Sequence, residues 1–113
     1  VATGRRANFE AWESAGVPRT ERGWLKVDPA TLEAVHAVYG AGDVPGIGGF
    51  THLAYYHGPL IARRLRGEDA RADHRAVPRV TFPDPEVASV GLSDAVPLGQ
   101  GNAVESAARE PAA

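Results

Sequence analysis

Apolar residues recur along the chain in short blocks that glycines and polar turns separate. The longest block with a helical period begins near Thr51 and ends at Gly67, after a basic last turn. Its apolar positions fall on one helical face; they are Leu53, Tyr56, Leu60, Ile61 and Leu65. We therefore expect a helix here, capped by the Thr51 side chain and kinked at Pro59, whose ring removes a backbone hydrogen bond.

The residues before this helix predict three shorter elements. Asn8 is placed to cap a short helix that runs through Glu13 and ends at Gly16. Residues 17–27 carry a polar turn between two extended arms, which favours a hairpin. Residues 35–41 are apolar, β-branched and aromatic, and this composition predicts one buried strand.

The chain ends are less regular. Residues 1–4 are typical of the end of a strand that stops at a glycine turn, and residues 68–76 form a charged linker. Strands are expected at 79–82 and 87–90, around a Pro-Asp-Pro turn. Periodicity is lost near the end, so we expect residues 96–113 to be a disordered or out-of-family tail.

Composition limits the function classes. The 113 residues suit one domain, with 43% hydrophobic and 23% charged positions. A net charge of −2 gives no general case for nucleic acid or a membrane surface as partner, and no apolar run approaches the ~18 residues of a membrane span. Cysteine is absent, which excludes a disulfide, a thiolate metal site or a thiol redox centre within these residues. The chain begins at Val1 and lacks methionine, so we expect a piece of a larger protein or a processed product.

The most informative unit is a strand followed by Gly42 and Asp43, a glycine-rich loop, and the helix that begins near Thr51. A carboxylate at the carboxyl edge of a sheet can accept hydrogen bonds from sugar or polyol hydroxyls. The helix N-terminus adds free N–H groups and partial positive charge, which together suit a polar, partly anionic cofactor. The alternative is that Asp43 only caps the loop, by accepting N–H groups of Gly46 or Ile47.

Other side chains give weaker indications. His52 and His57 are five positions apart and so lie on different helix faces, unlike the four-residue spacing of a zinc-binding helix. We therefore expect no metal site. The arginines at 63, 64 and 66 are typical of a solvated helix end that complements the helix dipole.

Four blocks of sequence carry a family resemblance when they are taken in order. They are VATGRRAN at 1–8, VHAVYGAGD at 35–43, THLA at 51–54 and PRVTFPDPEVASVGL at 78–92. This order and spacing resemble the class I pyridine nucleotide-disulfide oxidoreductases over about residues 1–95. The last block is quite specific and the Ala-Gly-Asp block moderately so.

The resemblance implies roles for these blocks. Residues 1–76 would be the C-terminal segment of the FAD/NAD(P)-binding domain, and residues 77–95 the start of the dimerisation domain. Asp43 would hold the ribityl chain of FAD, and residues 51–54 would face the pyrimidine ring of the flavin. The cofactor-binding residues implied in this way are Gly4, Gly42, Asp43, Thr51, His52, Leu53 and Ala54. No catalytic residue and no metal ligand is expected within the chain.

The fold class implied is α/β, as part of a Rossmann-like FAD/NAD(P)-binding domain followed by the first strands of a dimerisation domain. The function implied is electron transfer from NAD(P)H through FAD to a disulfide or related acceptor, in a cytoplasmic homodimer. Ala7 departs from the family's usual proline, His36-Ala37 from its usual Pro-Gly, and both the redox cysteine pair and the dinucleotide fingerprints are absent. A truncated, non-catalytic fragment or a small partner-binding protein without flavin therefore stays open as the alternative.

Overall fold

The computed structural model describes residues 1–91. Within these residues the backbone divides into two compact units, Val1–Ala72 and the part that begins at Asp73. The expected tail at 96–113 lies outside the described residues. No helix among residues 1–91 is both long and apolar enough to cross a membrane.

The first unit opens with an extended segment and a short 3-10 helix, η1 (Glu10–Ala15). The strand expected at residues 1–4 is wrong, since this segment pairs with no other strand. The short helix is confirmed but begins two residues after Asn8, whose Oδ1 accepts the Glu10 N–H at 3.3 Å. Gly16 ends it with a φ of 64°, in the left-handed region that glycine adopts without strain.

The hairpin over residues 17–27 is confirmed in minimal form. Arg19 and Leu25 form an isolated antiparallel bridge. The Thr20 N–H donates to the Trp24 carbonyl at 2.8 Å, and the Lys26 N–H to the Pro18 carbonyl at 2.9 Å. Leu25 is thereby held on the inner side of the unit, where it is buried.

The single strand expected over 35–41 is wrong. The chain instead forms a tight hairpin from β1 (Glu33–Val35) and β2 (Val38–Tyr39). The turn lies at His36 and Ala37, and Ala37 has a φ of 63°. Its N–H donates to the Glu33 carboxylate at 3.1 Å, a local bond that favours the turn over a continuous strand.

The longest element is α1 (Thr51–Leu65), which matches the expected helix. The expected Thr51 cap is wrong, because the N-cap is Phe50 and no side chain caps the helix there. The helix continues through Pro59, and Gly67 leaves it with a φ of 85°. The expected apolar stripe is only partly buried, since Tyr56 and Leu65 are 40% and 65% exposed.

The basic end of α1 is neutralised by the chain that follows. Arg63 and Arg66 both pair with Glu68, at 2.7 Å and 3.2 Å. The hydrogen bond from Arg63, joined by that from Arg66, lowers the pKa of Glu68 below its ordinary value. Arg63 and Arg66 are therefore engaged in ion pairs at the C-terminal end of α1.

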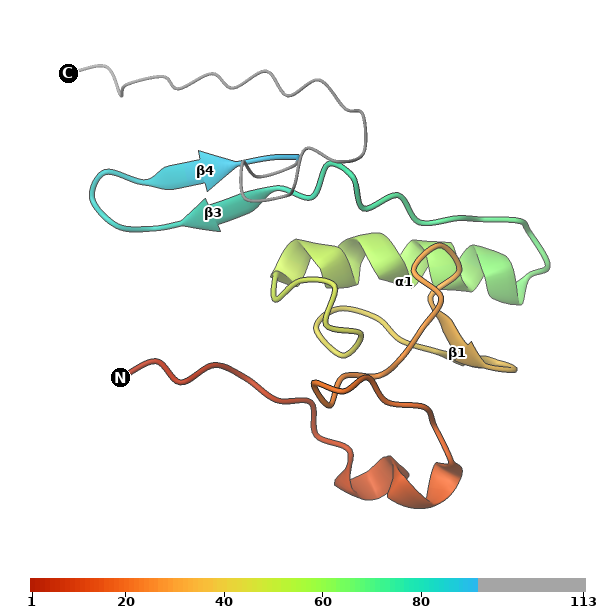
Figure 1. Ribbon diagram of the computed structural model, residues 1–113. Helices are drawn as coiled ribbons and strands as arrows, with labels where there is room; N and C mark the ends of the chain where they lie inside the picture. Colours follow the sequence, from red (N-terminus) through yellow and green to blue (C-terminus); the bar gives the residue numbers. More distant parts are fainter. Residues whose placement is uncertain (92–113) are drawn as a thin grey trace, which may run out of the picture. The chain divides into compact units, whose positions relative to one another are not determined.

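The core of this unit gathers one side chain from almost every segment. The buried apolar residues are Phe9, Leu25, Leu32, Leu53 and Ala70, and the fully buried His57 joins them. The loop between β2 and α1 packs against the first turns of the helix (Figure 1). This packing fixes where the loop lies relative to the helix N-terminus.

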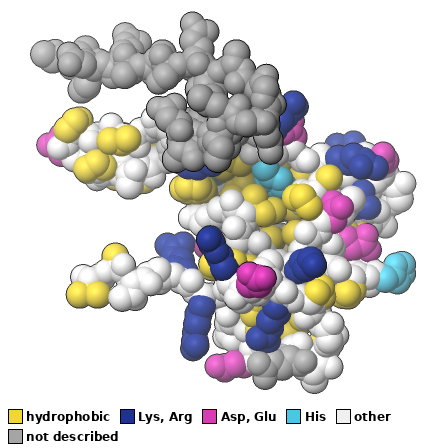
Figure 2. All heavy atoms as spheres, in the orientation of Figure 1, with side chains coloured by type: hydrophobic (Ala, Val, Ile, Leu, Met, Phe, Trp, Pro, Cys, Tyr) yellow, Lys and Arg dark blue, Asp and Glu magenta, His cyan; other side chains and the backbone are white. Residues whose placement is uncertain are grey.

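The second unit is a hairpin of β3 (Arg79–Thr81) and β4 (Val87–Ser89), as expected from the sequence. Its antiparallel register pairs Val80 with Ala88 and Thr81 with Val87. Every residue of both strands is exposed, and Figure 2 shows hydrophobic side chains on the hairpin surface. A helix with small antiparallel sheets is compatible with the α/β class.

Candidate functional site

The loop between β2 and α1 is held by backbone hydrogen bonds to its surroundings. The Gly40 N–H donates to the Leu32 carbonyl at 2.9 Å, and the Val44 carbonyl accepts the Leu25 N–H at 3.0 Å. Gly40 is so enclosed that an added Cβ would lie 2.9 Å from a Leu25 methyl carbon. The loop therefore leaves the hairpin along a fixed path.

Gly42 is the point at which this loop meets α1. It has a φ of 64°, and an added Cβ would lie 3.2 Å from the Cβ of Ala54. Its N–H donates to Nδ1 of His57 at 3.0 Å. The structure thus brings Gly42 and Ala54, two of the expected cofactor-binding residues, into contact.

Asp43 follows directly and turns its carboxylate toward the N-terminal segment. Its Oδ2 lies 3.1 Å from Nη1 of Arg5. The Gly46 N–H bonds to the backbone carbonyl of Asp43, at 2.9 Å, so the Asp43 side chain does not cap Gly46. The carboxylate is left partly exposed and able to accept further hydrogen bonds.

The N-terminus of α1 presents the second half of this site. No side chain caps it and no acidic residue lies in its first turn, so its partial positive charge is not compensated locally. The His52 ring stacks on Phe50, with 5.2 Å between ring centroids. Thr51 is exposed, whereas Leu53 is 2% exposed and its N–H already donates to the Phe50 carbonyl at 3.0 Å.

A pocket of about 290 Å³ opens beside Asp43. Its lining residues are Arg5, Trp24, Asp43, Gly46, Gly48 and Gly49. The indole of Trp24 forms one wall, and an added Cβ on Gly46 would lie 2.5 Å from it. Glycines here let backbone N–H and C=O groups line the cavity where side chains would otherwise fill it.

Gly4, the remaining expected residue, does not join this cluster through contacts of its own. It is exposed, and an added Cβ there would meet no atom within 4 Å. The N-terminal segment reaches the loop through Arg5 instead.

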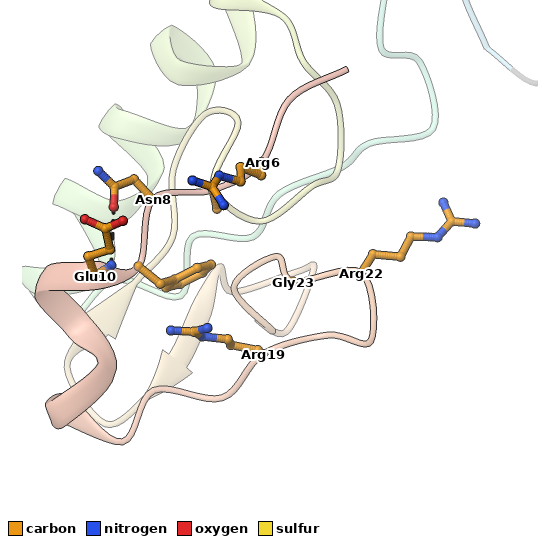
Figure 3. A pocket seen from close by; sticks show the side chains of 8 residues that line it. Arg6, Asn8, Glu10, Arg19, Arg22 and Gly23 are labelled. Carbon is orange, nitrogen blue, oxygen red and sulfur yellow. Dashed lines mark hydrogen bonds between the residues drawn. The ribbon is translucent and has the colours of Figure 1, made fainter. Parts of the chain in front are cut away.

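A second pocket, of about 590 Å³, lies between the segment before η1 and the 17–27 hairpin. Arg6, Arg19 and Arg22 line it, together with Glu10 and the polar Asn8. Figure 3 shows Arg22 pointing away from the other labelled side chains. The Arg19 guanidinium lies 4.4 Å from the centroid of the Phe9 ring, a packing contact that already occupies this cation. The arginines therefore do not converge on one point, and the Asp43 site is the better candidate.

Histidines do not assemble a metal centre in the part of the chain that the structure describes. No three His, Cys, Asp or Glu side chains gather there closely enough to hold an ion. His52 is exposed while His57 is buried, so the two do not face a common space.

The sequence assigned no role in this site to two residues of the region, Arg5 and His57. Arg5 could not be placed, because its partner is 38 positions away and no short-range pattern links them. The burial of His57, by contrast, could have been predicted from its spacing. It lies four positions after Leu53 and three after Ala54, on the helix face that the apolar period marks as buried.

Comparison with known proteins gives consistent matches. A Chlamydia trachomatis protein named dihydrolipoyl dehydrogenase is 41% identical over 95 residues, which cover 82% of this chain and 20% of that protein. The Bacillus subtilis protein of the same name is 35% identical over 97 residues, 84% of this chain and 21% of the relative. The Staphylococcus aureus protein of that name is 35% identical over 109 residues, 94% of this chain and 23% of the relative. No family model matches the chain.

The chain spans about a fifth of the length of these curated relatives. The matched share of the chain itself is high in each case, so the similarity is not confined to one motif.

Proposed function

Because the chain belongs to the class I pyridine nucleotide-disulfide oxidoreductase family, we propose that it forms the flavin-facing part of an FAD-binding domain. The observation that carries the proposal is the close approach of Gly42 to Ala54, which leaves no room for a Cβ on Gly42 without a shift. Gly42 directly precedes Asp43, and Ala54 lies in the first turn of α1. The Asp43 carboxylate, a hydrogen-bond acceptor, and the N-terminus of α1 are therefore parts of one site.

The residues present fit the polar middle of a flavin dinucleotide. The pocket beside Asp43, at about 290 Å³, is at the small end of the range for ligand sites. It has room for a ribityl chain and not for a whole dinucleotide. Part of the cofactor would therefore lie against surfaces other than this pocket.

Asp43 and the helix N-terminus would make different contributions. A ribityl hydroxyl that donates to the Asp43 carboxylate forms a charge-assisted bond, which stabilises by about 1.5–3 kcal/mol. The N-terminus of α1 would stabilise negative charge on the flavin ring by roughly 0.3–2 kcal/mol. When bound, FAD supplies the acceptor for a hydride and passes electrons onward; the chain's own residues hold and polarise it.

The remaining parts of the proposal rest on the family. NAD(P)H would be the electron donor, a disulfide or related group the acceptor, and a homodimer the assembly, in the cytoplasm. Thr51, His52 and Leu53 would line the flavin-ring side of the site. The contacts would come mainly from the backbone N–H groups of Thr51 and His52, since the Leu53 N–H donates to the Phe50 carbonyl. Gly4 would lie on the chain's approach to the cofactor.

The deciding experiment replaces the carboxylate, Asp43→Ala, in the full-length product of the reading frame that encodes residues 1–113. FAD affinity is measured by flavin fluorescence and by retention through dialysis. A ligand role lowers the affinity about tenfold or more, since a factor of ten corresponds to about 1.4 kcal/mol. Asp69→Ala is the matched control, because Asp69 is an exposed acid that pairs with Arg71 at the far end of α1.

Two results would contradict the proposal. One is an Asp43→Ala variant that keeps flavin as tightly as the unaltered protein and loses only thermal stability. The other is an unaltered protein that binds no flavin, which would favour a small partner-binding protein.

A further inference from the structure

His57 is fully buried at 0% exposure and is bonded to the residue that precedes Asp43. Its Nδ1 accepts the Gly42 N–H at 3.0 Å, across 15 positions of sequence. The bond therefore ties the second turn of α1 to the start of the glycine loop.

The bond fixes the chemical state of the imidazole. A nitrogen that accepts an N–H cannot carry a proton of its own, so His57 is neutral with its proton on Nε2. Gly42 is equally dependent on the bond. Its N–H is buried in a left-handed turn outside the strand ladder, where an unpaired donor would be unfavourable.

Two contacts hold Gly42 against the same face of α1. Ala54 and His57 are three positions apart and so are neighbours on the helix surface. Ala54 leaves little free space beside Gly42, since an added Cβ would lie 3.2 Å from the Ala54 Cβ, while His57 supplies a directional hydrogen bond. A rotation of the Gly42 peptide would break this hydrogen bond, and the closely packed Ala54 leaves little space for the loop to move toward the helix.

We propose that His57 is the positioning residue of the flavin site: through Gly42 it sets the direction in which the Asp43 carboxylate leaves the loop. This inference rests on the proposed flavin role of Asp43. His57 is not among the residues that line the pocket and, on this assignment, does not touch the cofactor. If His57 only fills space, any side chain of similar volume can replace it. If it positions Gly42, the replacement must also carry a hydrogen-bond acceptor where Nδ1 lies.

The test compares His57→Leu with His57→Asn in the full-length product of the reading frame. Asn places Oδ1 close to where Nδ1 lies, so it can accept the Gly42 N–H, while Leu fills space without an acceptor. FAD affinity and the midpoint of thermal unfolding are measured for both. His36→Leu is the matched control, since His36 is an exposed histidine in the β1–β2 turn.

We expect His57→Leu to lower FAD affinity about tenfold, with His57→Asn recovering most of it and His36→Leu changing nothing. Equal losses in the Leu and Asn variants would overturn the positioning role, as would a Leu variant that keeps FAD while Asp43→Ala loses it. If Asp43→Ala also keeps FAD, the proposed function fails instead.

A measurement without flavin covers the case in which the Leu variant does not fold. Nitrogen-15 NMR of the unaltered protein should show a hydrogen-bond coupling between the Gly42 amide and an unprotonated His57 Nδ1. A protonated Nδ1, or no coupling, would overturn the inference directly.

Discussion

Arg5 and Asp43 form an ion pair that joins two segments 38 positions apart, with 3.1 Å between Nη1 and Oδ2. The side chains are 74% and 45% exposed. Water therefore screens the attraction, and exposed pairs of this kind contribute about 0–1 kcal/mol. A pair this weak can open or share its carboxylate, so Arg5 does not prevent Asp43 from accepting a ligand hydroxyl.

The first prediction concerns this pair. Arg5→Gln should lower the free energy of unfolding by less than about 1 kcal/mol at low salt, and by still less at high salt, because the attraction is screened. Chemical denaturation at two ionic strengths checks it. Asp43→Asn is the partner variant, and the double variant should show little coupling. A loss above about 2 kcal/mol that salt does not change would mean that the pair is effectively buried.

The second prediction separates steric contact from backbone strain in the pocket wall. Gly16 and Gly46 have nearly equal φ angles of 64° and 68°, but an added Cβ meets nothing within 4 Å at Gly16 and lies 2.5 Å from Trp24 at Gly46. Both alanine variants carry similar strain, about 1–2 kcal/mol. Gly46→Ala adds an overpacking term of about 1–3 kcal/mol. Denaturant midpoints should therefore rank Gly46→Ala clearly below Gly16→Ala, and equal midpoints would show that Trp24 can move away.

Local signals in the sequence predicted most element positions in this fold. Helix α1, the end of the short helix at Gly16 and the two strands around the Pro-Asp-Pro turn follow from periodicity, glycine placement and β-branched runs. The strand over 35–41 failed, because its apolar composition concealed a turn. The Ala37 N–H bond to Glu33 stabilises that turn, and neither residue is a typical turn former there.

The candidate site was predictable at Asp43 and at the helix N-terminus, where motif and chain order carry the information. The parts that could not be predicted depend on contacts distant in sequence. The pairing of Arg5 with Asp43 and the bond from Gly42 to His57 both need the folded chain to bring their partners together. The Thr51 cap failed for a smaller reason, since the helix begins one residue earlier than a cap at that position requires.

The third prediction concerns acid pH. The Thr31 and Ala30 N–H groups bond to the Asp28 carboxylate and lower its pKa below the ordinary 3.8. A lowered pKa means that the stabilisation is present above pH 3.8 and is lost as the pH falls through the folded-state pKa. Asp28→Asn keeps an acceptor but cannot titrate, so its thermal midpoint should fall less steeply below pH 3.8. Parallel curves for the two proteins would contradict the assignment.

The fourth prediction is that the 113-residue chain alone, supplied with FAD, does not oxidise NADH or NADPH above a blank without protein. Electron transfer from NAD(P)H to a disulfide requires a hydride donor site and a thiol pair, and residues 1–113 contain neither a dinucleotide fingerprint nor a cysteine. The absorbance of the reduced nicotinamide at increasing protein concentration checks this. A rate that rises in proportion to protein, and disappears on heating, would show that the chain turns over by another route.

The last prediction concerns Pro59, an exposed residue inside α1. Its ring removes the N–H that would bond to the Tyr55 carbonyl, and proline in a helix interior is about 3 kcal/mol less favourable than alanine. Replacing proline also loosens the unfolded chain, which offsets about 0.4–1 kcal/mol of the gain. We therefore expect Pro59→Ala to raise the free energy of unfolding by about 2 kcal/mol, measured by circular dichroism in denaturant.

Gly58→Ala is the matched control. An added Cβ there meets no atom within 4 Å, so the free energy of unfolding should rise by no more than the helix-propensity difference of about 1 kcal/mol. If Pro59→Ala gains no more than Gly58→Ala, the helix already accommodates the ring by bending, and the Tyr55 carbonyl finds its hydrogen bonds in water.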